Sequence, residues 1–335
     1  MTGVRGEGPG EANGQGRGGG DQDSVESGDA WLAERFEQNR GRLRAVAYRM
    51  LGSLEEADDA VQEAWVRFAA AGADGVENLA GWLTTIVTRV CLNVLRARAA
   101  RPETLAGPWI PDPVLSPADG PTPEQEALLA DSVGLAMLVV LDTLTPAERV
   151  AFVLHDVFDV PFGEIAPMLG RTPEASRQLA SRARQRVRTA GTHEPDGTLA
   201  AQRAVIDAFF AAARAGDLAT LVELLHPDVV LRTDGFVAGS ALLRGADTVA
   251  RATLGGARPE AEFRPVVVNG VAGVLVTLRG RPAGLMAFTI VGGRITAVDG
   301  ITDPRRLRRL VAAHGLDDPP DQPDAAEQPA DPDQP

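Results

Sequence analysis

The chain has 335 residues, 44% of them hydrophobic, and carries a formal net charge of −13. This length suffices for two or three domains with substantial cores, and the acidic balance argues against a protein that coats nucleic acid through overall charge. Cys91 is the single cysteine, which excludes an intrachain disulfide and a cysteine-rich metal site and predicts a reducing, cytoplasmic setting.

Both ends of the chain have the composition of segments that lack a packed core. Residues 1–29 contain ten glycines and almost no large apolar side chains, so we expect a flexible leader there. Residues 317–335 contain seven acidic residues, six prolines and no basic residue, which predicts a disordered acidic tail over 316–335. No apolar run approaches the roughly 20 residues that span a bilayer, so we expect no membrane segment.

Residues 30–101 are predicted to form an all-helical module with two contrasting outer faces. An early helix has an apolar stripe at Ala57, Val61, Ala64, Trp65 and Phe68. Five acids lie largely off that stripe and predict an acidic face: Glu55, Glu56, Asp58, Asp59 and Glu63.

A later helix of this module is predicted over residues 79–100. We expect it to bury Leu79, Leu83, Ile86, Val87, Val90 and Val94. We expect it to expose a hydroxyl-rich and basic face made of Thr84, Thr85, Thr88, Arg89, Asn93 and Arg96. Trp82, near the start of the helix, is equally consistent with stacking on an unpaired base and with packing in the core.

Residues 102–123 are rich in proline and predict a stiff, extended linker. Trp109 stands between prolines, with Pro111 and Pro113 after it. This arrangement offers Trp109 to a partner surface, although an anchor packed on a neighbouring domain is the favoured interpretation.

Residues 124–190 contain the helix start and stop signals of a helix-turn-helix. Thr145 is a predicted N-cap, with Pro146 at the first helical position and Glu148 placed to complete a capping box. Gly170 ends a short second helix, and Thr172 caps a third one. This order of cap, tight turn and cap is typical of modules that bind DNA.

The third helix, from Pro173 to Arg188, is predicted to carry the contacts. Between Arg171 and Arg188 there are six arginines and one acidic residue, and such side chains can bind phosphates and base edges in the major groove. A helical hairpin with a solvated basic face is the alternative. The candidate DNA contacts, which the resemblance described below assigns to an upstream element, are Thr172, Ser176, Arg177, Gln178, Ser181, Arg182 and Arg184.

Residues 198–315 predict an α+β cone. Residues 204–235 are expected to form a helix, a short second helix and a strand that begins near Asp228. Four more strands are expected near 261–269, 272–279, 284–291 and 294–301. Asn269-Gly270 and Gly292-Gly293 supply hairpin turns. His226 is interpreted as a turn residue, and no partner for acid-base chemistry can be named for Asp234, so we predict no enzyme, no cofactor and no metal.

The two helical modules, in this order, resemble an extracytoplasmic-function sigma factor. The residues that carry the resemblance are 47–68, 78–100 and 145–188. It implies that Asp58, Asp59, Gln62 and Glu63 bind core RNA polymerase. It further implies that Trp82, Thr85, Arg89 and Asn93 contact the minus-ten element of promoter DNA, and that the helix from Arg177 to Arg188 reads the minus-thirty-five element.

The linker and the C-terminal region resemble the subgroup of these factors with a SnoaL-like extension. The sequence GPWIPDP at 107–113 is similar to the linker signature of that subgroup, with Ile110 and Asp112 replacing leucine and glutamate. Phe236 interrupts the glycine-rich motif expected after Asp234, and TDPRRL at 302–307 matches the terminal signature only loosely. Trp109, Pro111 and Pro113 are the expected interdomain linker residues.

These patterns predict a multidomain sigma factor that recruits core polymerase, recognises a promoter and is regulated in cis by its extension. The alternative is a ligand-responsive regulator that uses only the helix-turn-helix, with the cone as a small-molecule sensor. A third class is a pocket enzyme acting on a small hydrophobic molecule and tethered to DNA. Whether a small-molecule ligand occupies the C-terminal pocket is left open.

Overall fold

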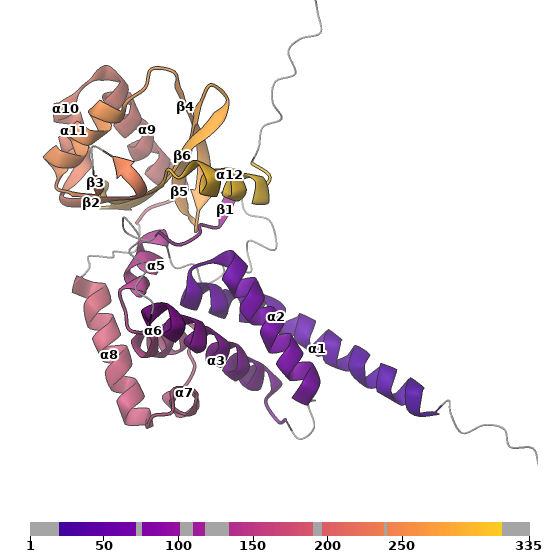
Figure 1. Ribbon diagram of the computed structural model, residues 1–335. Helices are drawn as coiled ribbons and strands as arrows, with labels where there is room; N and C mark the ends of the chain where they lie inside the picture. The colour runs from indigo at the N-terminus through magenta and orange to yellow at the C-terminus, as the bar shows by residue number, and fades with distance from the viewer. Residues whose placement is uncertain are drawn as a thin grey trace, which may run out of the picture.

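The structure is a computed structural model that describes residues 20–71, 76–100, 110–117, 134–189, 196–237 and 240–316. The predicted acidic tail after Leu316, the first 19 residues of the predicted leader, and Trp109 lie outside these residues. The predicted fold class is confirmed, because two helical modules are followed by an α+β domain (Figure 1).

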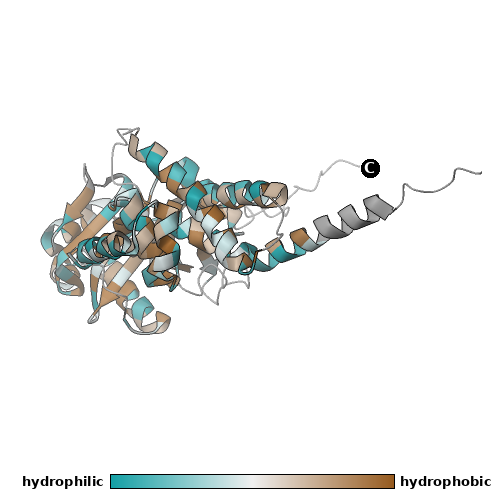
Figure 2. Ribbon diagram, turned by 90° about the horizontal axis from the view of Figure 1, so that it is seen from below, coloured by the Kyte–Doolittle hydropathy of each residue, from teal (hydrophilic) through white to brown (hydrophobic). Residues whose placement is uncertain are grey.

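The N-terminal module consists of α1 (Gly20–Leu51), α2 (Leu54–Ala71) and α3 (Leu79–Ala100). Phe36, Phe68 and Leu83 are fully buried where the three helices meet. Helix α1 begins inside the segment for which we expected a flexible leader. Hydrophilic and hydrophobic residues alternate along the part of α1 that Figure 2 colours by hydropathy. Within the described ranges, no helix is long and apolar enough to cross a membrane.

Within its described residues, the second module contains the three predicted helices together with one helix before them and a π-helix that directly follows the first of the three. It comprises α5 (Leu135–Asp142), α6 (Pro146–Phe152), the π-helix η1 (Val153–Val157), α7 (Phe162–Leu169) and α8 (Pro173–Thr189). The capping box of Thr145 and Glu148 is present, and Gly170 ends α7 with a φ of 64°. Both predicted helix signals are therefore confirmed, whereas the π-helix was not foreseen.

Within the described residues, the C-terminal domain contains four helices and six of the seven strands of one sheet, and the linker supplies the seventh strand. The helices are α9 (Leu199–Ala215), α10 (Leu218–Leu224), α11 (Ala246–Gly256) and α12 (Pro304–Ala313). The strands are β1 (Leu115–Pro117), β2 (Leu225–Val237), β3 (Ser240–Arg244), β4 (Ala261–Val268), β5 (Val271–Leu278), β6 (Arg281–Val291) and β7 (Arg294–Ile301). Their order is β1-β4-β5-β6-β7-β2-β3, and only β2 and β7 pair in parallel.

The two faces of this sheet contribute to two different cores. On one face of the sheet, Phe209, Phe210 and Phe288 belong to an apolar core that α9, α10 and α11 cover. This face of the sheet and these three helices form the cone. The other face, including Leu285 and Ile301, joins the same apolar cluster as α12, α5 and the helical modules. The sheet is thus buried on both sides, and the domain is packed against the rest of the chain rather than tethered beside it.

The linker supplies the edge strand β1, which sequence analysis missed. Leu115 pairs with Val268, and Pro117 pairs with Val266, in antiparallel register with β4. Pro111 and Pro113 are buried, which agrees with a linker packed on its neighbours. Proline is tolerated in this strand because β1 lies at the sheet edge.

Candidate nucleic-acid interface

Helix α8 presents a polar face to solvent on an apolar support. Ala180, Ala183 and Val187 are buried against the rest of the second module. Thr172 lies before the helix, and its hydroxyl accepts a hydrogen bond from the Ala175 amide at 3.2 Å. Arg177, Gln178, Ser181 and Arg182 are exposed, as predicted, while Arg184 is half-buried.

Local ion pairs hold some of these arginines in place. Arg177 pairs with Glu174 at 2.6 Å and lies over the Phe162 ring, and Arg184 pairs with Asp156 of η1 at 2.5 Å. Among the described residues Arg182 has no ion pair, so its guanidinium group is available to a ligand. Of the three candidate arginines of α8, two are therefore positioned by ion pairs and one has no ion pair among the described residues.

The predicted exposure of Ser176 is wrong. Its side chain is fully buried, and its hydroxyl donates to the Thr172 carbonyl at 3.1 Å. A serine one turn into a helix can satisfy its hydroxyl on the preceding turn, which permits burial against the module. Ser176 is therefore part of the support of α8 and is not presented to a ligand.

The candidate residues of α3 differ in their exposure to solvent. Arg89 and Asn93 are exposed, and Thr85 is half-buried with its hydroxyl bonded to the Gly81 carbonyl at 2.9 Å. Trp82 is half-buried and packs edge-on against Phe68 at 5.6 Å between ring centroids. This contact supports the core interpretation of Trp82 while leaving part of the indole accessible.

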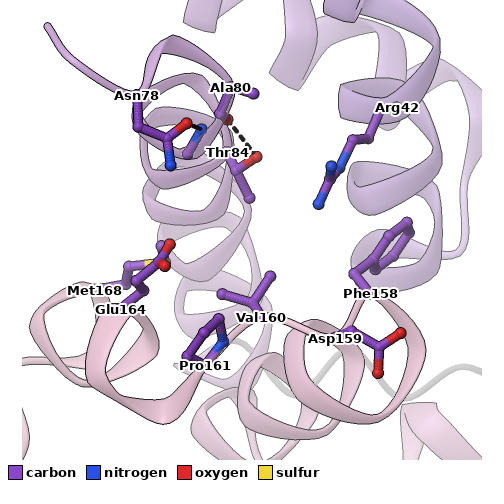
Figure 3. Close-up of a pocket in the computed structure, with 11 residues that line it drawn as sticks. Arg42, Asn78, Ala80, Thr84, Phe158, Asp159, Val160, Pro161, Glu164 and Met168 are labelled. Atoms are coloured by element: carbon purple, nitrogen blue, oxygen red, sulfur yellow. Dashed lines mark hydrogen bonds between the residues drawn. The ribbon is translucent and has the colours of Figure 1, made fainter.

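Two residues that we expected on the outer face of α3 are covered. Thr84 is 3% exposed and Thr88 is fully buried, because α6 and α7 of the second module pack on α3. Thr84 and Arg42 line a cavity of about 200 Å³ between the two modules, opposite Phe158 and Glu164 (Figure 3). The periodicity of α3 reports only how this helix packs within its own module. It therefore could not show that the second module also packs on α3.

Arg149 joins the two helical modules through a buried guanidinium group. It donates to the Met50 carbonyl at the end of α1 at 2.9 Å and pairs with Asp142 of its own module at 2.6 Å. Burial lowers the pKa of Arg149, and the carboxylate of Asp142 opposes that shift. A second contact places the Arg49 guanidinium over the Phe158 ring at 5.1 Å.

The acidic face of α2 is exposed as predicted. Asp58, Asp59, Gln62 and Glu63 all lie on the solvent side of the helix. Asp58 is paired with Arg44 of α1 at 2.5 Å, and Glu63 with Arg67 at 2.5 Å. Asp59, like Glu55, is exposed and has no ion pair among the described residues, so its charge is not compensated there.

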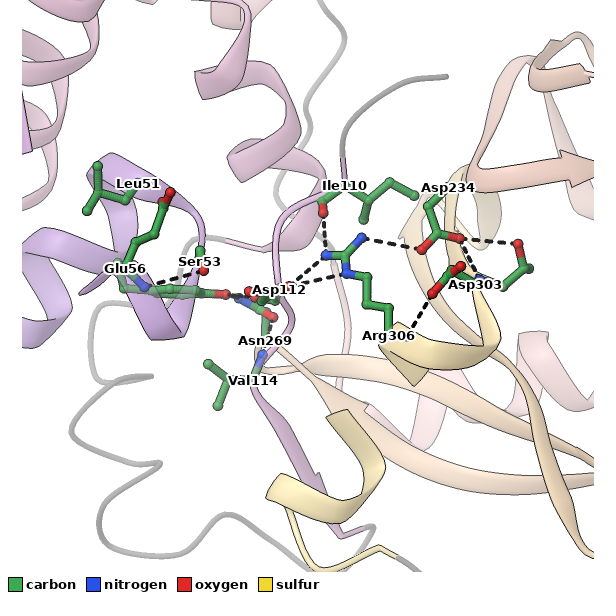
Figure 4. Close-up of polar contacts among 12 residues, drawn as sticks. Leu51, Ser53, Glu56, Ile110, Asp112, Val114, Asp234, Asn269, Asp303 and Arg306 are labelled. Atoms are coloured by element: carbon green, nitrogen blue, oxygen red, sulfur yellow. Dashed lines mark hydrogen bonds and ion pairs between the residues drawn. The ribbon is translucent and has the colours of Figure 1, made fainter. Parts of the chain in front are cut away.

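A polar network connects the linker to the first module and to the sheet (Figure 4). The buried Tyr48 hydroxyl donates to the Asp112 carbonyl and accepts from the Asn269 side-chain amide at 3.0 Å. Asn269 also accepts from the Val114 amide at 2.9 Å. Burial raises the pKa of the Tyr48 phenol, which therefore remains a neutral donor at physiological pH.

Arg306 of α12 also contacts this linker. Its guanidinium group pairs with the Asp112 carboxylate at 2.8 Å, donates to the Ile110 carbonyl and reaches Asp234 at 3.4 Å. Asp234 in turn accepts from the Thr302 amide at 2.6 Å and the Asp303 amide at 3.0 Å. Asp112, Asp234 and Arg306, which lie far apart in sequence, thus form one cluster.

The two residues that sequence analysis weighed for acid-base chemistry both have other hydrogen-bond partners in the structure. Asp234 is engaged in this cluster, and the ring of His226 accepts from the Asp228 amide at 3.1 Å, as a turn residue does. Within the described residues, no group of three or more histidine, cysteine, aspartate or glutamate residues is arranged to hold a metal ion.

Comparisons with known proteins cover both helical modules and the extension. Residues 35–101 match the family Sigma-70 region 2, and residues 135–187 match Sigma-70, region 4. The chain is 38% identical over 290 residues to the ECF RNA polymerase sigma factor SigJ of Mycobacterium tuberculosis, covering 81% of this chain and 92% of that protein. It is 35% identical to the probable ECF RNA polymerase sigma factor SigI of the same species, covering 85% and 96% respectively.

The similarity extends to three-dimensional structure. The crystal structure of M. tuberculosis SigJ superposes with a TM-score of 0.65 at 34% identity, covering 85% of this chain and 99% of that one. The match therefore extends well beyond the two helical modules into the α+β domain.

Proposed function

The chain belongs to the extracytoplasmic function (ECF) RNA polymerase sigma factors, and we propose that it reads a bipartite promoter with α8 and α3 while α2 binds core polymerase. The observation that carries this proposal is the free polar face of α8 on a complete helix-turn-helix. Arg177, Gln178 and Arg182 lie on that face, where guanidinium and amide groups can reach base edges in the major groove.

In this proposal, α3 contacts the minus-ten element. Its accessible residues, Thr85, Arg89 and Asn93 with the exposed part of Trp82, offer hydroxyl, cationic, amide and aromatic groups suited to a partly unpaired strand. Thr84 and Thr88 extend the same polar face under the second module. Reading of the minus-ten element by the whole face therefore requires the second module to move away from α3.

The α+β domain is proposed to regulate initiation in cis and to have no catalytic role. It holds the linker through β1, Asn269 and Arg306, and that linker joins the two DNA-reading modules. A domain that favours one arrangement of the modules over another shifts their equilibrium by the difference in binding free energy. We expect truncation after Arg188, Trp109→Ala or Arg306→Met to change promoter-dependent transcription at equal protein concentration.

Run-off transcription with purified core polymerase tests the assignment. We expect promoter-specific transcripts only when the protein is present, whereas a regulator that uses the helix-turn-helix alone would bind DNA without starting synthesis. Asp59→Arg should weaken core binding at least about tenfold, because it reverses an exposed, uncompensated charge on α2. Glu260→Arg is the matched control, since it makes the same charge change on an exposed residue of the α+β domain.

Equal transcription by the truncated, Trp109→Ala and Arg306→Met variants across a range of core concentrations would contradict regulation in cis. Equal core binding by Asp59→Arg and the unsubstituted chain would contradict docking through α2. The absence of any promoter-specific transcript would contradict the proposed function itself.

A further inference from the structure

Helix α12 has a basic outer face that none of the assignments above explains. Leu307, Leu310 and Val311 are buried against the rest of the molecule, and Arg306 points inward to the linker. The outward positions hold Arg305, Arg308 and Arg309, all exposed. None of these three side chains has an ion pair among the described residues, and the helix itself contains no acidic residue.

These three arginines do not serve the stability of α12. Arg305 lies in the first turn, where the positive end of the helix dipole disfavours a cation. Arg305 also lies three and four residues from Arg308 and Arg309, a spacing at which like charges repel. Elsewhere in the structure, exposed helical arginines such as Arg67 and Arg251 pair with an acid one turn away. Charges that destabilise the helix on which they lie are typical of functional sites.

The position of α12 brings its basic outer face close to the linker between the two DNA-reading modules. Arg306 grips Ile110 and Asp112 of the linker, so the outward arginines lie one helix width from the segment that joins the two DNA-reading modules. In Figure 1, α12 lies beside β1 at the junction of the α+β domain with the N-terminal module. DNA bound by α3 and α8 would have its spacer between these two helices, and the linker that Arg306 holds joins the same two modules.

We propose that Arg305, Arg308 and Arg309 bind the phosphate backbone of the promoter spacer, independently of its sequence. The inference rests on the proposed function, because it requires α3 and α8 to hold the flanking elements. Guanidinium groups suit phosphate oxygens, and Arg89 and Arg182 on the two DNA-reading helices are likewise exposed without an ion pair among the described residues. In a chain of net charge −13, three unpaired cations within five residues favour a polyanion as the ligand.

The salt dependence of promoter binding tests the proposal. The reconstituted holoenzyme is titrated with promoter DNA between about 50 and about 200 mM salt, a range over which each phosphate contact contributes about 0.9 to the slope of log K against log salt. The triple variant Arg305→Gln, Arg308→Gln, Arg309→Gln should make that slope shallower by about 2.7 if each arginine binds one phosphate. This corresponds to about 40-fold less affinity lost over the same range.

The matched control is the triple variant Arg279→Gln, Arg281→Gln, Arg294→Gln. These three exposed arginines lie on the β5–β6 and β6–β7 hairpins, so the control removes the same charge from another part of the same domain. The control should keep the wild-type slope, and phosphate-ethylation interference should lose spacer positions only in the α12 variant. Because the replaced arginines repel one another, the melting temperature of the α12 variant should not fall.

Four results would overturn the proposal: a wild-type slope in the α12 variant, an equal loss in both triple variants, no interference in the spacer, or weaker binding of the α12 variant to core polymerase without DNA. The last result would identify an acidic protein surface as the ligand. If the unsubstituted holoenzyme itself fails to bind the promoter, the proposed function fails; if it binds and only the slopes coincide, the inference alone fails.

Discussion

The two helices expected to read DNA differ in how the folded chain presents them. Helix α8 carries its polar face on the outside of its module, with Arg177, Gln178 and Arg182 exposed. Helix α3 has a comparable polar face, but the second module covers Thr84 and Thr88. The difference indicates that the face of α8 proposed to contact the upstream element is open in this arrangement, whereas the complete face of α3 proposed for the minus-ten element becomes available only after the modules separate.

The contacts that cover α3 differ in kind from those that hold the linker. The cover depends on the apolar cluster that the two helical modules share, on the Arg149 bond to Met50 and on the Arg49–Phe158 contact, and the interface also contains a cavity. The linker is held by strand pairing with β4 together with hydrogen bonds from Asn269 and Arg306. An interface that contains a cavity is easier to open than a segment held by strand pairing and buried hydrogen bonds, so we expect the linker to stay on the sheet when α3 is uncovered.

The largest effect is expected from Arg149→Met, which removes the buried guanidinium that joins α6 to α1. A hydrogen bond from a charged donor contributes about 1.5–3 kcal/mol, so the fraction of molecules with α3 uncovered should rise roughly 10- to 100-fold. The free protein should then bind a single-stranded minus-ten oligonucleotide more tightly by a similar factor.

Arg186→Met is the control for this substitution, because Arg186 pairs with Glu148 inside its own module at 2.6 Å. Unchanged oligonucleotide binding by Arg149→Met would mean that the Arg149 contact does not hold the cover in place.

A smaller effect should separate Arg182→Ala from Arg89→Ala. Arg182 is exposed and unpaired on α8, so its alanine variant should lose about 1–3 kcal/mol of binding to duplex upstream-element DNA, already in the free protein. Arg89 lies on the partly covered helix, and its loss should be measurable only in the holoenzyme. Equal losses in the free protein would show that α3 is as available as α8.

The smallest effect concerns two serines of α8. Ser176 is buried and bonds within its helix, whereas Ser181 is exposed on the proposed reading face. Ser176→Ala should leave DNA affinity unchanged, and Ser181→Ala should lower it by about 0.5–1.5 kcal/mol, the contribution of one hydrogen bond. Calorimetric titration with duplex DNA distinguishes the two, and the reverse order would show that the face of α8 has been assigned wrongly.

Sequence patterns predicted the parts of this molecule whose physics is local. Thr145, Glu148 and Gly170 marked helix ends correctly because caps and left-handed residues act within one turn. The hairpin turns at Asn269-Gly270 and Gly292-Gly293 were predicted for the same reason, and these residues do have positive φ. The acidic face of α2 followed from helical periodicity alone.

The parts that sequence patterns missed depend on contacts between modules. Thr84 and Thr88 are polar and sit where periodicity predicts solvent, yet another module packs over them. Leu115 to Pro117 joins a sheet whose other strands begin more than 100 residues later, a pairing that no local pattern encodes. The cluster of Asp112, Asp234 and Arg306 is invisible for the same reason, since its members meet only in the folded chain.

The distance between the two helical modules tests the central claim most directly. Fluorophores on Glu34→Cys in α1 and Gln185→Cys in α8 report it, because both positions are exposed. Cys91 will not take the label, since burial raises its thiol pKa to about 12. We predict that this distance increases when the factor binds core polymerase and promoter DNA. An unchanged distance in the promoter complex would contradict the conclusion that α3 must be uncovered to read DNA.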